Sequence, residues 1–438
     1  MNPAPRMTVR AAAVEVARRL AEAGHVAFFA GGCVRDQLLG SEPEDYDIAT
    51  DARPERIQAV FPKARGVGEA FGVMLVRAAG HTFEVATFRE DGPYHDGRRP
   101  AAVTFADAEA DANRRDFTVN GLFQDPQTGA IVDYVKGQDD IAARCIRAIG
   151  DPHERIAEDR LRMLRAVRFA ARLGFAIDPA TGAAVRAHAG ELRSVSPERV
   201  GDEVRRMLAH PARARAAQLV EAHALDGAIF GVGVDGAGGA RPRLAGLPSD
   251  AVWTTALAAW WLDRAAWWSD RAAGWPDRAA AGAGGRVPGT DAAEAAGVVS
   301  GLRSRLVLSN DETEALLACL AARRAQLDGY ESLTLARRKR WMAAPGFDAA
   351  LAILETEDRA RVALLRDEAD RELPSRRLPT PLVDGNVLVS EGMRPGPEFK
   401  VLLDLAMDAQ LEGRVDSREG ALALIRSAVQ GTSRGDAT

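Results

Sequence analysis

The feature that most constrains this chain is GGCVRDQLLGSEPEDYDIATD, the stretch from Gly31 to Asp51. An apolar run, HVAFFA at 25–30, precedes it and predicts a buried strand. The Gly31-Gly32 pair allows a tight turn and a close approach of the backbone to a ligand. Residues 33–39 then predict a short helix. Because free N–H groups point outward at a helix start, this turn is a candidate anion site.

Two acids, Asp45 and Asp47, stand at the head of a second predicted strand, residues 46–50. Residues two apart on a strand face the same side, so we expect both carboxylates to project together. Mg²⁺ prefers such oxygen ligands and completes its shell with water and phosphates. A GG pair or a DxD alone is usually a turn. The two in this order predict nucleotide chemistry, most simply two-metal nucleotidyl transfer. Glu84 is a candidate third acid, or simply an exposed strand residue.

This order of motifs resembles the DNA polymerase β-like nucleotidyltransferase superfamily. GGxVRD followed by DxD is more closely similar to the class II tRNA nucleotidyltransferases and the bacterial poly(A) polymerases. The alternating short strands and helices of residues 25–150 predict a mixed α/β palm. The resemblance implies an α+β protein in which a polymerase β-like palm, or head, precedes all-helical neck, body and tail domains.

A second motif, NRRDFTVN, occupies residues 113–120. Arg114 and Arg115 are suited to neutralise a triphosphate by bidentate contacts. Asp116 and Asn120 offer groups that suit ribose hydroxyls, which sugar selection requires. Alone, the motif would be a charged surface patch. In its place after the first motif it matches the family's RRDFTxN, and the resemblance assigns Gly31, Gly32 and Arg35 to the same nucleotide site.

A third motif, EDRLR, lies on a long helix predicted to begin with Asp151 as N-cap. Asp159, Arg162 and Arg165 recur every three residues and share one polar stripe, and Arg168 follows on the same helix. An internal salt-bridge ladder is the structural alternative. EDxxR, however, resembles the motif by which class II enzymes read the incoming base.

Base reading by Asp159 follows from the chemistry of the base edges. A carboxylate accepts from the exocyclic amine of cytosine or adenine, whereas uracil and guanine present a carbonyl there. The resemblance therefore implies that protein side chains select CTP and ATP. The SPERVGDE run resembles the next family motif, with Ser196 and Pro197 starting a helix. Glu198, Arg199 and Glu203 would brace the base-reading helix.

The motifs and the composition divide the chain into four predicted parts. These are a head (1–140), a neck (141–215), a body (216–345) and a tail (346–438). Residues 141–217 hold fifteen Arg, no Lys and nine acids, a balance of +6. Such a block suits a phosphate backbone, although codon usage is an alternative. The tail run GMRPGP and the helix after it resemble the elements that hold the tRNA elbow in bacterial class II enzymes.

Composition places few other limits on the chain. Its net charge of −5 does not by itself indicate a nucleic-acid partner. The three cysteines lie far apart without metal spacing, which fits a reducing cytoplasm. The longest strongly apolar stretch, 251–262, is too short for an ordinary membrane span. The tryptophans interleaved through 231–300 would pack between helices or, alternatively, stack on RNA bases.

The predicted function is template-independent addition of CCA to tRNA from CTP and ATP with Mg²⁺. A polar loop, 89–110, corresponds to a flexible loop that helps the family switch from CTP to ATP, and it is not shortened here. The run at 66–73 is more similar to the tRNA enzymes than to poly(A) polymerases. An A-adding or CC-adding enzyme, a poly(A) polymerase and a non-catalytic RNA-binding relative remain alternatives. The oligomeric state is left open.

Overall fold

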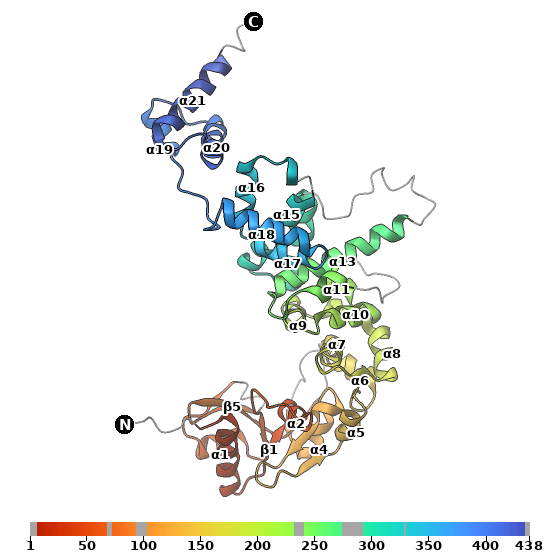
Figure 1. Ribbon diagram of the computed structural model, residues 1–438. Helices are drawn as coiled ribbons and strands as arrows, with labels where there is room; N and C mark the ends of the chain where they lie inside the picture. The colour runs from red at the N-terminus through yellow and green to blue at the C-terminus, as the bar shows by residue number, and fades with distance from the viewer. Residues whose placement is uncertain are drawn as a thin grey trace. The chain divides into compact units, whose positions relative to one another are not determined.

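In the computed structural model (Figure 1), the chain forms two compact units. The first unit is residues 1–240 with 304–307, and the second is residues 241–303 with 308–438. The structure describes residues 7–67, 72–92, 103–231, 241–273, 292–327 and 330–433. The predicted run at 66–73 and loop at 89–110 therefore lie partly outside the described residues.

The first unit begins with a seven-stranded mixed sheet of order β3-β4-β5-β2-β1-β8-β9. Strand β2 runs parallel to β5, and all other neighbours in this sheet are antiparallel. Its strands are β1 (Ala27–Ala30), β2 (Ile48–Thr50), β3 (Arg65–Gly66), β4 (Val73–Ala78), β5 (His81–Thr87), β8 (Leu122–Gln124) and β9 (Ile131–Asp133). The mixed α/β palm predicted from the sequence is thus confirmed.

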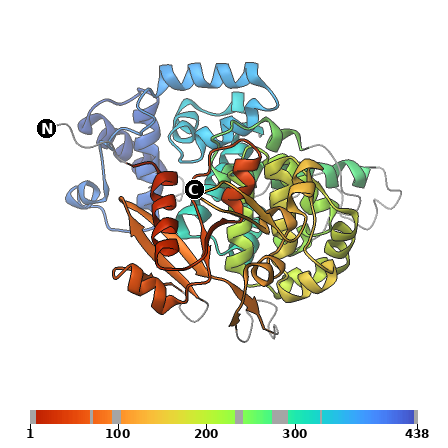
Figure 2. The same cartoon turned by 90° about the horizontal axis from the view of Figure 1, so that it is seen from below.

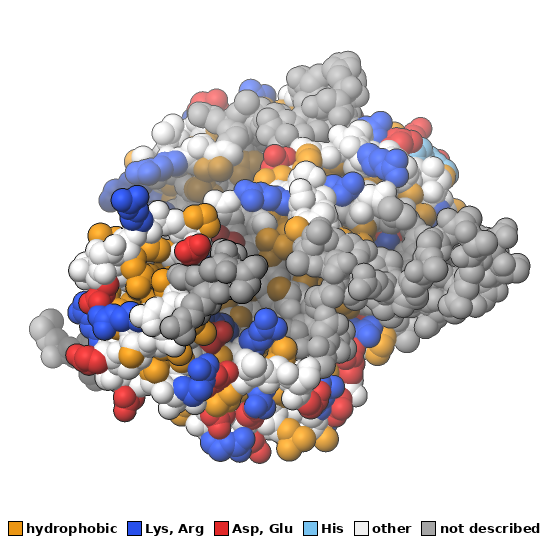
Figure 3. All heavy atoms as spheres, turned by 90° about the horizontal axis from the view of Figure 1, so that it is seen from above, with side chains coloured by type: hydrophobic (Ala, Val, Ile, Leu, Met, Phe, Trp, Pro, Cys, Tyr) orange, Lys and Arg blue, Asp and Glu red, His pale blue; other side chains and the backbone are white. Residues whose placement is uncertain are grey.

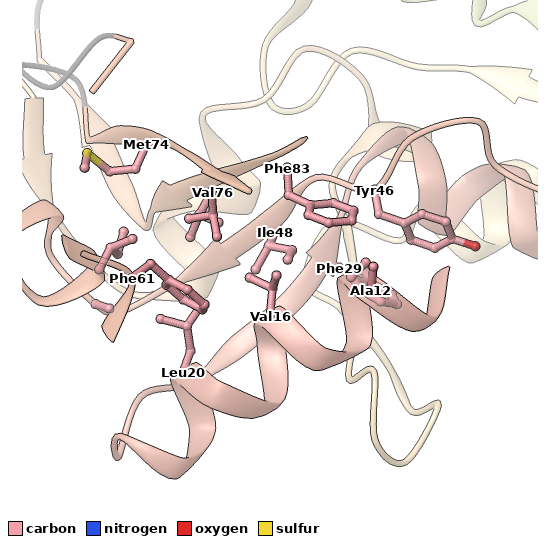
Figure 4. Close-up of a cluster of buried hydrophobic side chains, with 14 of the residues drawn as sticks. Ala12, Val16, Leu20, Phe29, Tyr46, Ile48, Phe61, Met74, Val76 and Phe83 are labelled. Atoms are coloured by element: carbon pink, nitrogen blue, oxygen red, sulfur yellow. The ribbon is translucent and has the colours of Figure 1, made fainter. Parts of the chain in front are cut away.

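One face of this sheet is covered by helices α1 (Val9–Glu22) and α3 (Pro54–Val60), as Figures 1 and 2 show for α1. Figure 4 shows Val16 of α1 beside Ile48 of the sheet, and Leu20 of α1 beside Phe61. Thr8 caps α1, because its hydroxyl accepts from the Ala11 N–H. Every third or fourth residue of α1 is apolar and buried, so the helix is fixed by this core.

The other face of the sheet packs on helix α4 (Ala108–Asn113). Alternation along the strands produces the two cores. Phe29 and Ile48 enter the first core, whereas their neighbours Ala30 and Ala49 enter the second with Phe123. Helix α2 (Gly32–Leu38) follows β1 directly, and its Cys33 and Val34 join the first core. The glycine turn and α2 are therefore positioned at the edge where the candidate site lies.

Helices make up most of the remainder of the first unit, with a hairpin between them and the sheet. The hairpin is β6 (Arg89–Asp91) with β7 (Val103–Phe105). Short elements follow as η2 (Thr118–Asn120), α5 (Gly137–Ala142), and β10 (Cys145–Ile146) paired with β11 (Ala176–Ile177). The helices that follow are α6 (Pro152–Glu158), α7 (Arg162–Leu173), α8 (Pro179–His188), α9 (Pro197–Leu208), α10 (Arg213–Ala222) and α11 (Asp226–Phe230), with η3 (Ala189–Ser194) before α9.

Two predictions about this unit are wrong in detail. The long helix from Pro152 is broken, because Asp159 adopts an extended conformation between α6 and α7. Its carboxylate accepts from the Leu161 N–H and its carbonyl from the Arg162 N–H, so it starts a new helix. The strand predicted at 46–50 begins only at Ile48, and the DxD motif lies in the extended segment just before it.

The second unit consists of helices α12 (Pro242–Gly246), α13 (Trp253–Ala273), α15 (Asn310–Leu327), α16 (Leu335–Met342), α17 (Phe347–Glu355), α18 (Arg359–Glu372), α19 (Gly385–Ser390), α20 (Glu398–Leu411) and α21 (Arg418–Ser433), with η4 (Tyr330–Ser332). Helix α14 (Ala292–Leu306) runs into the first unit at its end. Trp341 donates to the Ala322 carbonyl and packs between the rings of Tyr330 and Phe347. Trp260 is buried, which confirms packing for that residue.

The observed architecture, a mixed sheet followed by helices, confirms the predicted α+β class. The finer division into head, neck, body and tail stays a prediction. No helix within the described ranges is long and apolar enough to cross a membrane. Basic and acidic side chains are interspersed on the face drawn in Figure 3, in line with the nearly balanced charge.

Candidate active site

A large cleft in the first unit, with a volume of about 1320 Å³, holds nearly all the predicted site residues. Its walls come from the glycine turn, the DxD segment, the RRDFTVN motif and the start of α7. The predicted residues that line it are Gly31, Gly32, Arg35, Asp45, Asp47, Arg114, Arg115, Asp116, Asn120, Asp159, Arg162 and Arg165. Arg168 lines a smaller adjoining hollow instead. The fold therefore brings together motifs that are more than a hundred residues apart.

The paired acids lie exposed on the cleft wall. Asp45 and Asp47 are both accessible to solvent, and Glu84 of β5 lines the same cleft. Surrounding protein displaces much of the water from Asp47, which raises its pKa to about 6. The charges of Glu84 and Asp45 contribute to this rise, and Arg115 opposes it. No group of three metal-ligating side chains is assembled within the described residues, so Asp45 and Asp47 are candidate ligands as a pair.

The glycine turn is shaped by its contact with Arg115. Gly31 has φ +73°, and a Cβ at this position would lie 2.9 Å from the Nη1 atom of Arg115. A Cβ on Gly32 would meet nothing closer than 3.7 Å. Only the first glycine is therefore required by backbone conformation and space, which explains its place between β1 and α2.

The two arginines of the second motif are held by one buried carboxylate, Asp111 of α4. Its Oδ1 accepts from Nε and Nη2 of Arg114 at 2.9 and 2.6 Å. Its Oδ2 accepts from Nε and Nη2 of Arg115 at 3.2 and 2.9 Å. The side chain of Asp111 is only 2% exposed. Asp111 thus orients both guanidinium groups, with Arg115 also stacked over Phe123.

A chain of polar contacts links the glycine turn to helix α7. Arg35 donates to Oδ1 of Asn120 at 2.6 Å, and the Asn120 amide donates to Asp116 at 3.1 Å. Arg165 of α7 completes the chain with an ion pair to Asp116 at 2.6 Å. Burial alone would raise the pKa of Asp116, but the charge of Arg165 and these hydrogen bonds outweigh it and hold the pKa below its usual range. Asp116 therefore stays ionised.

Asp159 is held by α9 rather than by its own helix. Arg199 donates to both carboxylate oxygens, at 3.1 and 2.7 Å. Arg162 pairs instead with Glu158 and also donates to the Arg155 carbonyl. The salt-bridge ladder considered for Asp159 and Arg162 is therefore absent between these two described residues. The predicted brace by Arg199 is confirmed.

The second predicted brace, Glu203, is also confirmed. It is buried and pairs with Arg168, while Arg165 lies 4.0 Å from it. Glu198, in contrast, is exposed. Cation–π contacts on α7 also help to hold these arginines. The guanidinium carbons of Arg165 and Arg168 lie 5.3 and 4.3 Å from the centre of the Phe169 ring.

Several residues of the site were not identified from the sequence. Asp111 is one, although an acid three and four residues before an arginine pair at a helix end is a recognisable signal. Arg172, Arg206 and His210 are three more, and all of them line the cleft. They come from α7 and from α9 with the turn after it, so only the packing of these helices brings them together.

Comparisons with known proteins agree with the motifs. Residues 27–147 match the model of the poly A polymerase head domain, and residues 174–228 match a probable RNA- and SrmB-binding site of polymerase A. A CCA-adding enzyme of Geobacillus stearothermophilus is 42% identical over 221 residues, 50% of this chain and 54% of the relative. One of Lacticaseibacillus paracasei is 44% identical over 198 residues, 45% of this chain and 50% of the relative. The chain spans about half the length of these relatives.

Solved structures extend the similarity of fold over the whole chain. The CCA-adding enzyme of Bacillus stearothermophilus in complex with CTP has a TM-score of 0.72 and 27% identity, covering 98% of this chain and 100% of that one. The Thermotoga maritima CCA-adding enzyme in complex with tRNA has a TM-score of 0.61 at 17% identity, covering 97% of both chains, and shows the fold alone. In the sequence of its N-terminal half and in its fold, this chain resembles the CCA-adding enzymes and poly A polymerases, as its motifs predicted.

Proposed function

We propose that this chain is a tRNA nucleotidyltransferase that adds CCA to the tRNA 3′ end from CTP and ATP. The observation that supports this most strongly is a single cleft that joins three chemistries. Paired carboxylates suit a metal–triphosphate, fixed arginines suit its phosphates, and the Asp159–Arg199 pair suits a base edge. The relatives named as CCA-adding enzymes have the same fold.

The cofactor of this reaction would be Mg²⁺, held by Asp45 and Asp47. The donor set fits, because both carboxylates are exposed oxygen donors on one wall. The raised pKa of Asp47 also fits, because burial is its main cause, the charges of Glu84 and Asp45 add to it, and a divalent cation would relieve that negative charge. Bound there, Mg²⁺ would neutralise charge on the triphosphate and favour ionisation of the attacking hydroxyl.

The residues of this chain would orient the two substrates for an in-line displacement. The 3′-hydroxyl oxygen of tRNA attacks the α-phosphorus, its proton is lost, and the bond to the departing pyrophosphate breaks. Arg114 and Arg115 would bind the triphosphate, because Asp111 holds them side by side. Asn120 and Asp116 are placed next to them, where polar groups would select the ribose hydroxyls.

Base selection would depend on how Asp159 is oriented. Both of its oxygens are held by Arg199, which fixes the plane of the carboxylate while leaving further lone pairs available. A carboxylate in this state accepts from the amine of cytosine or adenine and repels the carbonyl of uracil or guanine. Arg162 and Arg165 line the same part of the cleft and are the candidate donors to ring acceptors.

The remaining parts of the proposal concern tRNA and location. Helix α20, which begins after the GMRPGP run, is the proposed tail element that contacts the tRNA elbow. Residues 1–140, 141–215, 216–345 and 346–438 are proposed as head, neck, body and tail. A cytoplasmic location accords with the three cysteines, all of which are free thiols.

Extension assays with the purified full chain test the activity. tRNAs that lack three, two or one of the terminal nucleotides are offered with CTP alone, ATP alone and both, and the products are sequenced. We expect two C residues from CTP alone, and a single terminal A once both C residues are present. An Asp47→Asn variant serves as the inactive control for contaminating enzymes.

Each alternative gives a different product in the same assay. Repeated A addition would indicate a poly(A) polymerase. Addition that stops after two C residues, or A addition only to a CC end, would indicate an enzyme specialised for one nucleotide. No product with any tRNA, together with retained tRNA binding, would show a non-catalytic RNA-binding protein and refute the proposed reaction.

A further inference from the structure

We propose that Arg172, Arg206 and His210 form a docking subsite for a backbone phosphate of the RNA strand that is extended. The inference rests on the proposed function and adds to it the place where the second substrate enters. The three residues belong to α7, to α9 and to the turn after α9. No predicted role in nucleotide binding involves any of them.

The first argument is the division of the cleft into two parts. A smaller hollow of about 440 Å³ adjoins the large cleft and is lined by Arg172, Arg206 and His210. Asp45 lines both the hollow and the cleft, so the hollow opens beside the proposed metal site. Arg172, Arg206 and His210 reach the large cleft as well, whereas Arg114 and Arg115 do not line the hollow. A second substrate that reacts beside Asp45 can therefore reach it through the hollow.

The second argument is the difference between these arginines and their neighbours. Arg168, one turn before Arg172 on α7, is 10% exposed and tightly paired with Glu203. The side chain of Arg172 is 46% exposed, and its nearest acid, Asp36, is 3.9 Å away. The side chain of Arg206 is 64% exposed, and Glu203 lies 3.9 Å from it. Arg172 and Arg206 thus keep most of their hydrogen-bonding capacity for an anion.

The third argument is the hydrogen bonding of His210. Its Nδ1 accepts from the Ala212 N–H at 3.1 Å, which leaves the ring proton on Nε2 in the neutral form. Burial lowers the pKa of His210, and the charges of Arg172 and Arg213 lower it further. A neutral ring with an Nε2–H donor contributes a hydrogen bond to a phosphate oxygen without adding a third charge.

Both substrates carry phosphates, so the chemistry alone fits a triphosphate or an RNA backbone. The position favours RNA. The triphosphate has its own fixed cations, Arg114 and Arg115, which do not line the hollow. Of the residues predicted to bind the nucleotide, the hollow contains only Arg168, which is already paired with Glu203. Exposed, loosely paired arginines are also suited to a strand that must shift after each addition.

Steady-state kinetics with the full chain test the subsite. Arg172→Ala, Arg206→Ala and the double variant are compared with Arg193→Ala, which removes an exposed arginine of η3. KM for tRNA is measured at saturating CTP, and KM for CTP at saturating tRNA, over a range of salt concentrations. We expect KM for tRNA to rise about tenfold for each change, whereas KM for CTP stays within about twofold. The slope of log KM for tRNA against log salt should fall by about 0.7 for each lost contact.

Direct binding of a fluorescent tRNA that lacks its terminal CCA provides a readout without turnover. The dissociation constant should rise in the double variant and in His210→Ala, but not in Arg193→Ala. A rise in KM for CTP with unchanged tRNA binding would assign the subsite to the triphosphate and overturn the proposal. Equal tRNA binding by the parent and the double variant would also overturn it. Loss of the proposed function would appear separately, as an inactive parent that still binds tRNA.

Discussion

Replacing Asp111 by Asn tests whether one buried carboxylate holds the nucleotide-binding arginines in place. Asp111 accepts five hydrogen bonds: two from Arg114, two from Arg115, and one from the Arg89 backbone N–H at 3.3 Å. Asn keeps the size of the side chain, but it removes the charge and turns one acceptor oxygen into a donor. Two guanidinium groups would then lie beside an amide, and the donor NH2 group of this amide would face the N–H donors of one of them.

The magnitude follows from burial. Removing one partner of a buried ion pair costs about 3–5 kcal/mol. The two arginines keep about a fifth of their surface exposed and can regain some water, so we expect the lower end, about 3 kcal/mol. For a unit of this size that corresponds to a Tm lower by about 6–12 °C. KM for CTP should rise as well, because the arginines lose their orientation.

The effect should also depend on pH. Burial alone would raise the pKa of Asp111, but the charges of Arg115 and Arg114 and their hydrogen bonds hold it below the usual range. A carboxyl group with a lowered folded-state pKa stabilises the fold above its unfolded pKa, about 3.9 for Asp, and ceases to do so as the pH falls through its folded pKa. The difference between parent and variant should be complete at pH 7 and shrink below about pH 4.

The assay must observe the first unit itself. The first of the seven tryptophans is Trp253, so tryptophan emission reports on the second unit. Hydrogen exchange of peptides from 108–124, with far-UV circular dichroism, is the appropriate measurement. Glu109→Gln is the matched control, because it removes one negative charge from an exposed position of the same helix and should change stability by less than about 0.5 kcal/mol. If Asp111→Asn is no more destabilising than this control, the anchoring role is refuted.

Three further predictions concern the cleft. Asp47→Asn should lower kcat by about a thousandfold, since several kcal/mol of transition-state stabilisation are lost. The Kd for tRNA should stay within about twofold of the parent value. Substantial magnesium-dependent activity of this variant would contradict the metal-binding role of Asp47. Asp159→Ala should raise UTP and GTP incorporation relative to CTP by about ten- to a hundredfold in competition assays. Arg199→Ala should cause part of that loss of selectivity, and the double variant should lose less than the sum of the two single changes. If both single variants keep the parent's selectivity, the Asp159–Arg199 pair has a structural role only. Gly31→Ala should lower the free energy of unfolding by about 1–3 kcal/mol and raise KM for CTP. Gly40 has a similar φ of +76° but open space around it, so Gly40→Ala should affect stability alone.

The sequence was sufficient for the elements whose signals are local. The glycine turn at Gly31 and the Ser196-Pro197 start of α9 both occur where they were predicted. The break at Asp159 was missed because helical periodicity continues through it. A short side chain that bonds to its own backbone competes with the helix, and this is decided by only a few hydrogen bonds.

Contacts between distant elements were harder to predict. The motifs identified the acids and arginines of the cleft, but they did not show that Asp111 holds two of the arginines. Arg172 and Arg206 could not be recognised either, because α7 holds several arginines of the same type. Only packing distinguishes Arg168, which is buried against Glu203, from Arg172, which stays exposed.

The fixed arginines of the large cleft affect the entropy of substrate binding. A free arginine side chain has about 2 kcal/mol of rotamer entropy to lose when it is ordered. Arg35, Arg114 and Arg115 have already lost it on folding, through Asn120 and Asp111. Nucleotide binding should therefore order few side chains, whereas docking of the RNA strand must order Arg172 and Arg206. In the proposed reaction, the nucleotide pocket keeps its shape between additions. The RNA strand is held by Arg172 and Arg206, which release it easily enough for it to move back by one nucleotide.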